Sequence, residues 1–470
     1  MADTSSIQLD ALSVVHAVVL VLVGYACLQL GLLVLDGSFM HLLLSEGRIV
    51  VAPLSKRIQS HGLSDAVKFR SSVHTSTTIR LPVATTVQPG QLTALPSLPH
   101  DIPMVQSAVA PPTGLRVLFF GTDAISLATL ELLHANMQPR LPHLPPLIHS
   151  IEVVCPTDKR VARTRSIAPV PVKQFALDNH LPIHHVPDNA KARRQWTVPP
   201  PATGSAFDIA VVVSFGYFIH PPMLANVAKG AINMHPSILP KYRGPAPIPR
   251  ALYHGDKATG ISIIEIDPRA FDVGRILYCD DTIAIPDTAT LPELSKRLAS
   301  RGAECVLHTL RDIDTLFQHA RPQDEASATA APKMRREDGI VLWTETAAQL
   351  YNMWRAVGAS YGVVASLGGK AIKFIEMHRP NMDAAVAFET RVAASVPAAA
   401  GMCWYDKATK GLWIQAADRE WIVVLRVQVA NRAVRTASEF ADGQRVRPLQ
   451  PFRFDQNDVV DAASRSVRCN

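Results

Sequence analysis

The sequence predicts an α/β domain with a parallel-rich sheet, followed by a small β-barrel domain. From residue 115 onward, short apolar runs alternate with helical patterns, and this alternation is typical of βαβ units. Polar or glycine-containing turns follow the apolar runs directly. Beyond residue 339, a helical stretch over 343–357 precedes short strand-like runs, which together favour a small barrel with one helix.

The elements of the α/β domain follow one another along the chain. The first apolar run ends at Gly121, and Ile125, Leu130 and Leu133 then recur at helical spacing. Residues 260–267 and 275–285 read as a further pair of alternating strands. The five runs expected to form the parallel part of the sheet are residues 115–120, 151–155, 183–186, 208–213 and 231–234.

Polar residues follow several of these strands, and ligands of such sheets bind outside the carboxyl ends of the strands. Gly121, residues 214–217 and residues 233–240 all stand there, so we expect the binding site at this edge. The first turn, Gly-Thr-Asp, lacks the Gly-x-Gly-x-x-Gly fingerprint of dinucleotide-binding proteins, and a phosphate-binding Gly-x-x-x-x-Gly-Lys loop is also missing. The sequence therefore argues against a nicotinamide enzyme.

Asn233, His235 and Asp272 are the candidate catalytic residues. The first two end an apolar run, and Asp272 lies in the turn Phe-Asp-Val-Gly. Singly, each has an ordinary explanation: a strand-end amide, a structural histidine and a turn-forming carboxylate. Together they suit acyl transfer to an amine. The amide stabilises a developing oxyanion, the imidazole moves a proton, and the carboxylate orients the ring.

Composition narrows the class of protein only slightly. The chain has 470 residues, a net charge of +7 and a pI near 9.1, which is compatible with nucleic-acid binding but does not establish it. The six cysteines are scattered without a Cys-x-x-Cys pair. We therefore expect reduced, mostly buried thiols, and neither a metal site nor a disulfide framework.

The first 113 residues form a separate N-terminal extension in this interpretation. Residues 11–35 carry no Asp, Glu, Lys or Arg and are long enough for a bilayer-spanning helix. Residues 56–80 are rich in basic and hydroxyl side chains, as in an organellar transit peptide. Either the apolar segment is a membrane anchor, or it is an upstream extension with the natural start nearer Met40, which we favour. Residues 82–113 read as a linker.

The stretch Asn-Met-His-Pro-Ser-Ile-Leu-Pro-Lys-Tyr-Arg-Gly-Pro-Ala-Pro-Ile, from Asn233 to Ile248, resembles the signature of formyltransferases that use 10-formyltetrahydrofolate. Its ending is most similar to the branch that formylates methionyl-tRNA. Phe-Phe-Gly-Thr at 119–122 and Val-Val-Val-Ser-Phe-Gly at 211–216 agree in order and spacing. The resemblance covers residues 115–317 strongly and 339–451 weakly. It implies a Rossmann-like catalytic domain over 114–317, a linker over 318–338 and an OB-like tRNA-binding domain over 339–470.

The resemblance also implies roles for individual residues. Asn233, His235 and Asp272 match the family's catalytic set. The implied co-substrate is 10-formyltetrahydrofolate without a metal, and the implied acceptor is the α-amino group of methionyl-tRNA. The residues expected at the folate site are Ser237, Ile238, Leu239 and Pro240, with Ser214, Phe215, Gly216 and Tyr217 bordering the pterin.

The tRNA would be held by two basic regions. A basic loop after the second strand matches the family's acceptor-arm loop, although Ala162 and Thr164 stand where the family favours glycine. The C-terminal domain is basic as well, and four cations in seven residues of the loop suit a phosphate track. The candidate tRNA-contacting residues are Lys159, Arg160, Arg163, Arg165, Arg432 and Arg435.

Alternatives stay open at this point. A formyltransferase acting on a small amine, such as glycinamide ribonucleotide or an amino sugar, would share the three catalytic residues. A catalytically retired RNA-binding protein of the same fold, or a membrane scaffold built on residues 11–35, would differ in class. We expect a monomer in the mitochondrial matrix that binds no DNA and contacts a membrane, if at all, only through residues 11–35.

Overall fold

The computed structural model describes residues 41–45, 48–52, 114–138, 145–160, 167–202, 204, 206–392 and 399–456. The chain divides into two units, residues 1–102 and 103–470. In the first unit the described residues form an antiparallel pair, β1 (His41–Ser45) and β2 (Arg48–Ala52). The segments 11–35 and 56–80 lie outside the described residues. Within the described part of the chain, no helix combines the length and apolar character needed to cross a membrane.

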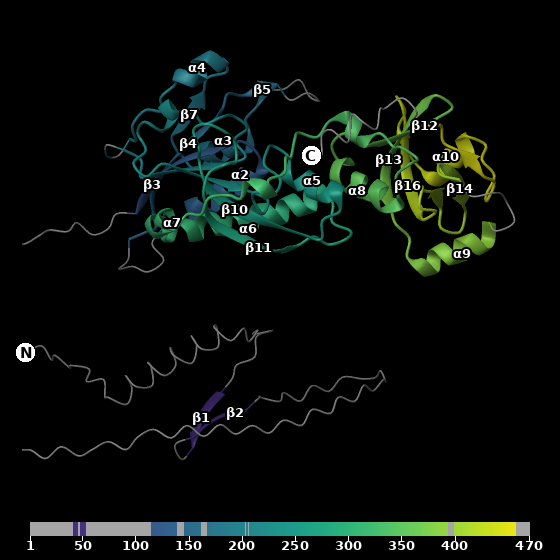
Figure 1. The fold of residues 1–470 in the computed structure, drawn as a ribbon, viewed down its shortest axis with the longest axis horizontal. Coiled ribbons are helices and arrows are strands. Elements are labelled where there is room, and N and C mark those ends of the chain that lie inside the picture. Colours follow the sequence, from purple (N-terminus) through teal and green to yellow (C-terminus); the bar gives the residue numbers. More distant parts are fainter. Residues whose placement is uncertain are drawn as a thin grey trace, which may run out of the picture. The chain divides into compact units, whose positions relative to one another are not determined.

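The second unit begins with a seven-stranded sheet of order β11-β10-β9-β8-β3-β4-β7 (Figure 1). The five strands from β9 to β7 are parallel, and β10 runs antiparallel to both β9 and β11. The parallel-rich α/β prediction is therefore confirmed. The strands are β3 (Leu115–Gly121), β4 (Ile148–Pro156), β7 (Ile183–Val186), β8 (Ile209–Val213), β9 (Ala231–His235), β10 (Ala258–Glu265) and β11 (Ile276–Ala284).

The central strand β3 shows why the sheet is built from continuous apolar runs. Val117 and Phe119 join one buried cluster, whereas Leu118 and Phe120 join another on the opposite face. Because successive side chains point to opposite faces and both faces are covered, the fully buried positions 117–120 are all apolar. The helices of this domain are α2 (Ala124–Ala135), α3 (Pro171–Asp178), α4 (Ala190–Gln195), α5 (Pro247–His254), α6 (Leu291–Arg311) and α7 (Ile313–Gln318).

Helix α6 supports the strand that carries Asn233 and His235. A capping box formed by Thr290 and Glu293 starts this 21-residue helix. Its apolar stripe faces the sheet, and Gly302 lies so close to β9 that a Cβ there would approach the Met234 side chain to 2.8 Å. The small residue thus lets the helix lie directly against the middle of β9.

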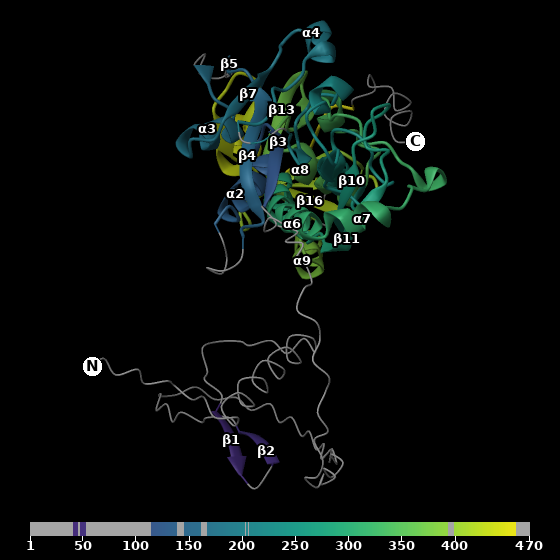
Figure 2. The ribbon, with the colours of Figure 1, turned by 90° about the vertical axis from the view of Figure 1, so that its left-hand side faces the viewer.

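The C-terminal domain is an antiparallel sheet of order β12-β13-β16-β15-β14-β18, with β17 paired to β16 (Figures 1 and 2). Phe388 of α9 stacks on Trp413 at a ring-centroid distance of 4.2 Å and closes one face of the sheet. The predicted small barrel-like domain is confirmed. Its elements are α8 (Ala347–Val357), β12 (Val363–Leu367), β13 (Lys370–His378), α9 (Met382–Val392), β14 (Met402–Asp406), β15 (Gly411–Gln415), β16 (Trp421–Val429), β17 (Val434–Thr436), α10 (Ala437–Gly443) and β18 (Phe452–Arg453).

Residues 318–338, predicted as an interdomain linker, lie against the α/β domain. Arg321 and Ile276 exchange two backbone hydrogen bonds of 2.9 and 2.7 Å, and the Arg243 amide donates to the Thr329 carbonyl oxygen at 2.8 Å. Ala331 is fully buried. This packing could not be predicted from the sequence because hydrogen bonds, rather than a periodic apolar face, hold the segment. We call residues 321–331 the strap.

Candidate active site

A cavity of about 620 Å³ opens at the carboxyl ends of β3, β8 and β9. The turn after β3, the loop after β8, the end of β9 and the start of α5 line it, together with the end of β10 and the turn beyond. Cavities of this size accommodate drug-sized ligands. The site therefore lies at the edge of the sheet that the sequence predicts.

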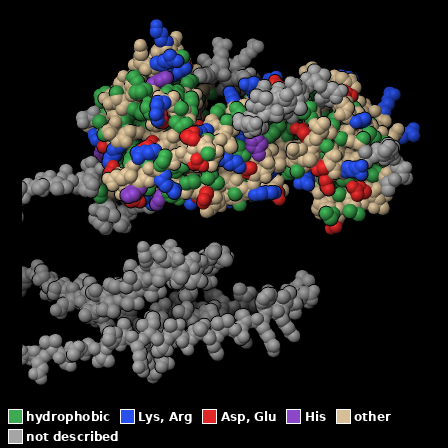
Figure 3. All heavy atoms as spheres, in the orientation of Figure 1, with side chains coloured by type: hydrophobic (Ala, Val, Ile, Leu, Met, Phe, Trp, Pro, Cys, Tyr) green, Lys and Arg blue, Asp and Glu red, His purple; other side chains and the backbone are tan. Residues whose placement is uncertain are grey.

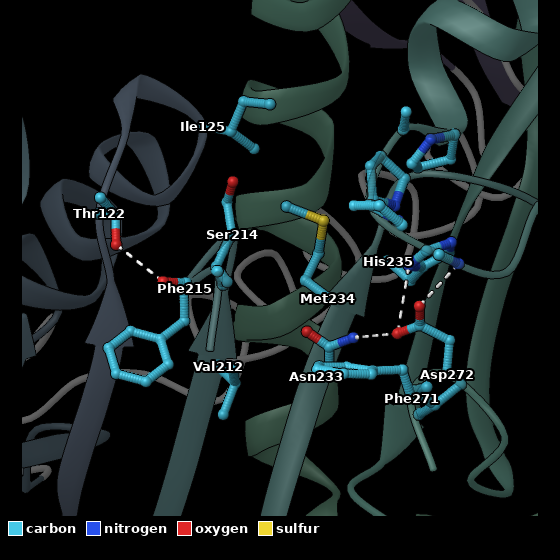
Figure 4. Close-up of a pocket in the computed structure, with 18 of the residues that line it drawn as sticks. Thr122, Ile125, Val212, Ser214, Phe215, Asn233, Met234, His235, Phe271 and Asp272 are labelled. Carbon is cyan, nitrogen blue, oxygen red and sulfur yellow. Dashed lines mark hydrogen bonds and ion pairs between the residues drawn. The ribbon is translucent and has the colours of Figure 1, made fainter. Parts of the chain in front are cut away.

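The three candidate catalytic residues meet in this wall (Figure 4). The Asn233 amide nitrogen donates to the Asp272 Oδ1 at 3.3 Å, and His235 Nδ1 lies 3.6 Å from the same oxygen. The backbone N–H of Gly244 donates to the other oxygen, Oδ2, at 2.9 Å. The carboxylate is thus held at both oxygens and faces the imidazole at ion-pair distance.

The His235 ring is oriented by a backbone group. Its Nε2 lies 2.8 Å from the carbonyl oxygen of Tyr242, which can only accept, so Nε2 carries a hydrogen. The neutral ring therefore has its lone pair on Nδ1, the nitrogen that faces Asp272. We had expected the carboxylate to orient the ring, whereas the structure gives that contact to the Tyr242 carbonyl.

The surroundings of the pair exclude most water. The His235 side chain is 5% exposed and that of Asp272 is 11% exposed. Electrostatic interactions strengthen when water is excluded, so charge that develops here interacts strongly with the three polar groups. The neighbouring Arg243 has a raised pKa, chiefly because its guanidinium hydrogen-bonds Glu325 and also because of the charges of Glu325 and Asp272.

The loop after β8 forms a second part of the wall. Ser214 adopts a left-handed backbone conformation with φ of 47°, and its hydroxyl donates to Asp123 at 2.6 Å. The Thr122 hydroxyl donates to the Phe215 carbonyl oxygen at 3.0 Å. These bonds join the turn after β3 to the loop after β8. All four residues predicted to border the pterin line the cavity: Ser214, Phe215, Gly216 and Tyr217.

The second predicted folate segment lies elsewhere. Ser237, Ile238, Leu239 and Pro240 are not among the residues that line the cavity. Instead, the Ser262 hydroxyl of β10 donates to the Ser237 carbonyl oxygen at 2.7 Å and accepts from the Leu239 amide at 3.0 Å. This segment contacts β10 and precedes Tyr242 and Gly244, whose backbone groups bond His235 and Asp272.

The candidate tRNA residues fall into three groups. Lys159 and Arg160 form β5 (Lys159–Arg160), which pairs with β6 (Ile167–Ala168). Arg163 and Arg165 lie outside the described residues. Arg432 and Arg435 are exposed near β17 in the C-terminal domain. The structure does not bring any of the described candidates into the cavity wall.

None of the cysteines that the structure describes lines the cavity. The four described cysteines, Cys155, Cys279, Cys305 and Cys403, are free. Burial raises the pKa of Cys155 and Cys305 to about 11, which makes both thiols poor nucleophiles. Among the described residues, no group of His, Cys, Asp and Glu is arranged to hold a metal ion.

Three groups that contact the candidate catalytic residues could not be predicted from the sequence: the Tyr242 carbonyl, the Gly244 amide and the side chain of Gln323. Gln323 Nε2 donates to the carbonyl oxygens of Asp272 and Gly274, both at 2.8 Å. No side-chain motif reports a backbone group. The sequence does show Tyr-Arg-Gly at residues 242–244. Gly244 has a φ of 122°, and a Cβ added to it would lie 2.9 Å from the Ala331 carbonyl oxygen. Both observations explain why this position is a glycine.

Comparisons with known proteins find similar sequences over both domains. Residues 115–310 match the family model "Formyl transferase", and residues 333–445 match "Formyl transferase, C-terminal domain". The chain is 30% identical over 329 residues to a mitochondrial methionyl-tRNA formyltransferase of Homo sapiens, covering 70% of this chain and 77% of that protein. A methionyl-tRNA formyltransferase of Syntrophus aciditrophicus is 30% identical over 336 residues, covering 71% of this chain and 97% of that protein.

A solved structure is also similar at lower identity. It is an N-formyltransferase from Helicobacter canadensis, in complex with folinic acid and dTDP-3-aminofucose. It is 16% identical, has a TM-score of 0.45, and covers 66% of this chain and 98% of that chain.

Proposed function

This chain belongs to the formyltransferase family, and we propose that it transfers a formyl group from 10-formyltetrahydrofolate to the α-amino group of methionyl-tRNA. The chain matches both domains of the family, and its curated relatives in mitochondria and bacteria are methionyl-tRNA formyltransferases. The observation that carries the proposal is the convergence of Asn233, His235 and Asp272 at one end of the cavity.

In the proposed reaction, the neutral amine attacks the formyl carbon and the carbonyl oxygen becomes anionic. One N–H of Asn233 is bonded to Asp272, which leaves the second N–H to donate to this oxygen. His235 Nδ1 takes the proton from the attacking nitrogen, and Asp272 stabilises the imidazolium. When the intermediate collapses, the C–N bond to the folate nitrogen breaks, and the same proton passes to that nitrogen.

The cavity suits the co-substrate in size and character. Its volume is about 620 Å³, and apolar groups form most of its wall beside the polar trio. The Phe215 ring packs edge to face on Phe120 and Tyr217. Such a wall provides apolar surface for a flat heterocycle. In this proposal the loop after β8 binds the pterin. Residues 237–240 do not line the cavity but contact β10.

The proposed tRNA surface begins beside the cavity. The Thr157 hydroxyl, just before the basic loop, donates to both carboxylate oxygens of Asp188 at 3.1 and 3.0 Å, just before α4. Helix α4 has the sequence Ala-Lys-Ala-Arg-Arg-Gln, and Lys and Arg side chains lie over it in Figure 3. The guanidinium of Arg193 lies 4.5 Å from the ring centre of Tyr217 in the cavity wall. These cations suit the phosphates of an acceptor arm.

We place the protein in mitochondria, where the matrix would be its site of action. The support is the mitochondrial assignment of its animal relatives. Expression of the full chain with a C-terminal fluorescent tag, followed by mitochondrial fractionation, would test this assignment.

An acceptor-competition assay tests the activity. The purified full chain is incubated with 10-formyltetrahydrofolate and either methionyl-tRNA, glycinamide ribonucleotide or an amino sugar nucleotide. We expect rapid formylation of methionyl-tRNA alone. Faster formylation of a small amine would refute the acceptor, and no transfer to any amine would refute the activity.

A further inference from the structure

The turn that carries Asp272 has a conformation that needs support. Asp272 has a φ of 59°, a left-handed backbone conformation that residues with a side chain adopt only rarely. The turn joins β10 to β11, and the preceding Phe271 is 60% exposed. Without additional contacts such a turn would relax, and its carboxylate would move away from His235.

The strap supplies these contacts through one side chain. Gln323 Nε2 donates to the carbonyl oxygens of both Asp272 and Gly274 at 2.8 Å. Both amide hydrogens of Gln323 are therefore used within the turn. The Arg321–Ile276 backbone pair fixes the chain two residues before Gln323. The Gln323 side chain therefore extends to the turn from a backbone that is held in place.

The same amide joins the turn to the loop that orients His235. Gln323 Oε1 accepts from Arg243 Nε at 2.9 Å, and Arg243 also bonds both oxygens of Glu325 at 2.7 and 2.8 Å. Arg243 lies between Tyr242, whose carbonyl holds His235, and Gly244, whose amide holds Asp272. One side chain thus links the supports of the imidazole and of the carboxylate.

We propose that Gln323 is a positioning residue that sets the distance between Asp272 and His235 for formyl transfer. The proposal rests on the proposed function, because it assigns Gln323 to the same site. It requires that a change at Gln323 act on the chemical step. Substrate binding should change little, since Gln323 does not line the cavity.

Two substitutions distinguish positioning from simple packing. Gln323→Glu keeps the shape but replaces the two N–H donors by an acceptor that faces two carbonyl oxygens. Gln323→Ala removes the group altogether. We expect kcat to fall about 10- to 100-fold in Gln323→Ala and further in Gln323→Glu, with KM for both substrates within about threefold of wild type. If the side chain only filled space, the isosteric Glu variant would be the more active of the two.

Gln318→Ala and Gln318→Glu are the matched controls, since Gln318 is exposed at the end of α7, and they should keep wild-type kinetics. Tetrahydrofolate binding and the melting temperature of each variant are measured alongside. Gln323→Glu activity within twofold of wild type would overturn the proposal, as would loss of tetrahydrofolate binding together with activity, because the residue would then maintain the fold of the cavity. Absence of methionyl-tRNA formylation by the wild-type chain would instead refute the proposed function.

Discussion

At the residue scale, Asn233, His235 and Asp272 are held by backbone groups as well as by one another. The amide, imidazole and carboxylate could be named because acyl transfer needs those chemical groups and because they follow predicted strands. The acceptor for His235 is the carbonyl of Tyr242, and every residue has a carbonyl. Only the left-handed conformation of Tyr242, with φ of 66°, turns this one toward the ring, so no residue type could have predicted it.

Asn233→Ala should reduce kcat by about a hundred- to thousandfold, because removal of one oxyanion donor costs on the order of 3 to 4 kcal/mol in the transition state. Tetrahydrofolate binding should persist, since the amide acts chiefly on the developing charge. Single-turnover formylation and equilibrium binding measure the two effects separately. Asn381→Ala is the control, because that side chain bonds Ala384 at the start of α9. Transfer by Asn233→Ala at the wild-type rate would remove Asn233 from the mechanism.

The ion pair of Arg116 and Asp208 predicts a pH-dependent contribution to stability. The carboxylate accepts from the Arg116 guanidinium at two 3.0 Å bonds, and this hydrogen bonding lowers the pKa of Asp208. A carboxyl with a lowered folded-state pKa stabilises the fold above its unfolded pKa of about 4 and loses that contribution as pH falls through the folded value.

Asp208→Asn should therefore lower the free energy of unfolding by about 1 to 2 kcal/mol at pH 7. The difference from wild type should shrink as the pH falls below about 4. Urea unfolding at pH 7, 4 and 3 measures it, and a difference that stays constant over this range would contradict the assigned cause.

At the element scale, the elements that could be predicted from the sequence are those that bury a run of apolar side chains. The predicted residues 115–120 and 208–213 correspond closely to β3 and β8 because a strand buried on both faces has to be apolar. The predicted residues 183–186 coincide with β7, although this edge strand is only partly buried. The strap could not be predicted in this way, since hydrogen bonds of its backbone and of Gln323 and Glu325, rather than a periodic apolar face, hold it. The antiparallel direction of β10 could not be predicted from the sequence either, because strand direction depends on the length and course of the connections.

The turn between β10 and β11 makes a prediction of its own. A Cβ at Gly274 would lie 1.9 Å from the backbone oxygen of Glu265, so Gly274→Ala must push the turn away from β10. The shift would displace Asp272 and the carbonyl that Gln323 holds. We expect at least a tenfold lower kcat.

Stopped assays under saturating substrates measure this kcat. Gly443→Ala serves as the comparison, because there the new Cβ would meet only the flexible end of Arg435, at 3.3 Å. Equal kcat values for the two variants would show that the turn tolerates displacement.

At the scale of the whole second unit, polar contacts of buried arginines tie the C-terminal domain and the strap to the catalytic domain. Arg355 of α8 donates to the carbonyl oxygens of Pro286 and Ala289 at 3.0 and 3.4 Å. Arg250 of α5 donates to Pro332 beyond the strap at 3.1 Å. A tRNA bound to the C-terminal domain would therefore bind a surface that is fixed relative to the cavity. The domain order could be predicted from the sequence, whereas these contacts could not, since an arginine is usually exposed.

The proposed tRNA surface of the C-terminal domain can be tested by charge reversal. Arg432 and Arg435 are exposed near β17, and each phosphate contact contributes about 0.9 to the slope of log affinity against log salt for a duplex. Arg432→Glu combined with Arg435→Glu should weaken tRNA binding and reduce this slope by up to about two, while kcat at saturating tRNA stays unchanged because neither side chain lines the cavity.

Filter binding of methionyl-tRNA between about 50 and 200 mM salt measures the slope. The affinity of a protein that makes several phosphate contacts falls strongly over this salt range. Lys407→Glu combined with Lys410→Glu makes the same change of net charge on the exposed β14–β15 turn and controls for the overall field of the protein. If Arg432 and Arg435 contact phosphates, the magnitude of the slope should decrease only in the arginine variant. A similar loss in both variants would mean that net charge, and not this surface, attracts the tRNA, and unchanged affinity across salt would exclude Arg432 and Arg435 from the interface.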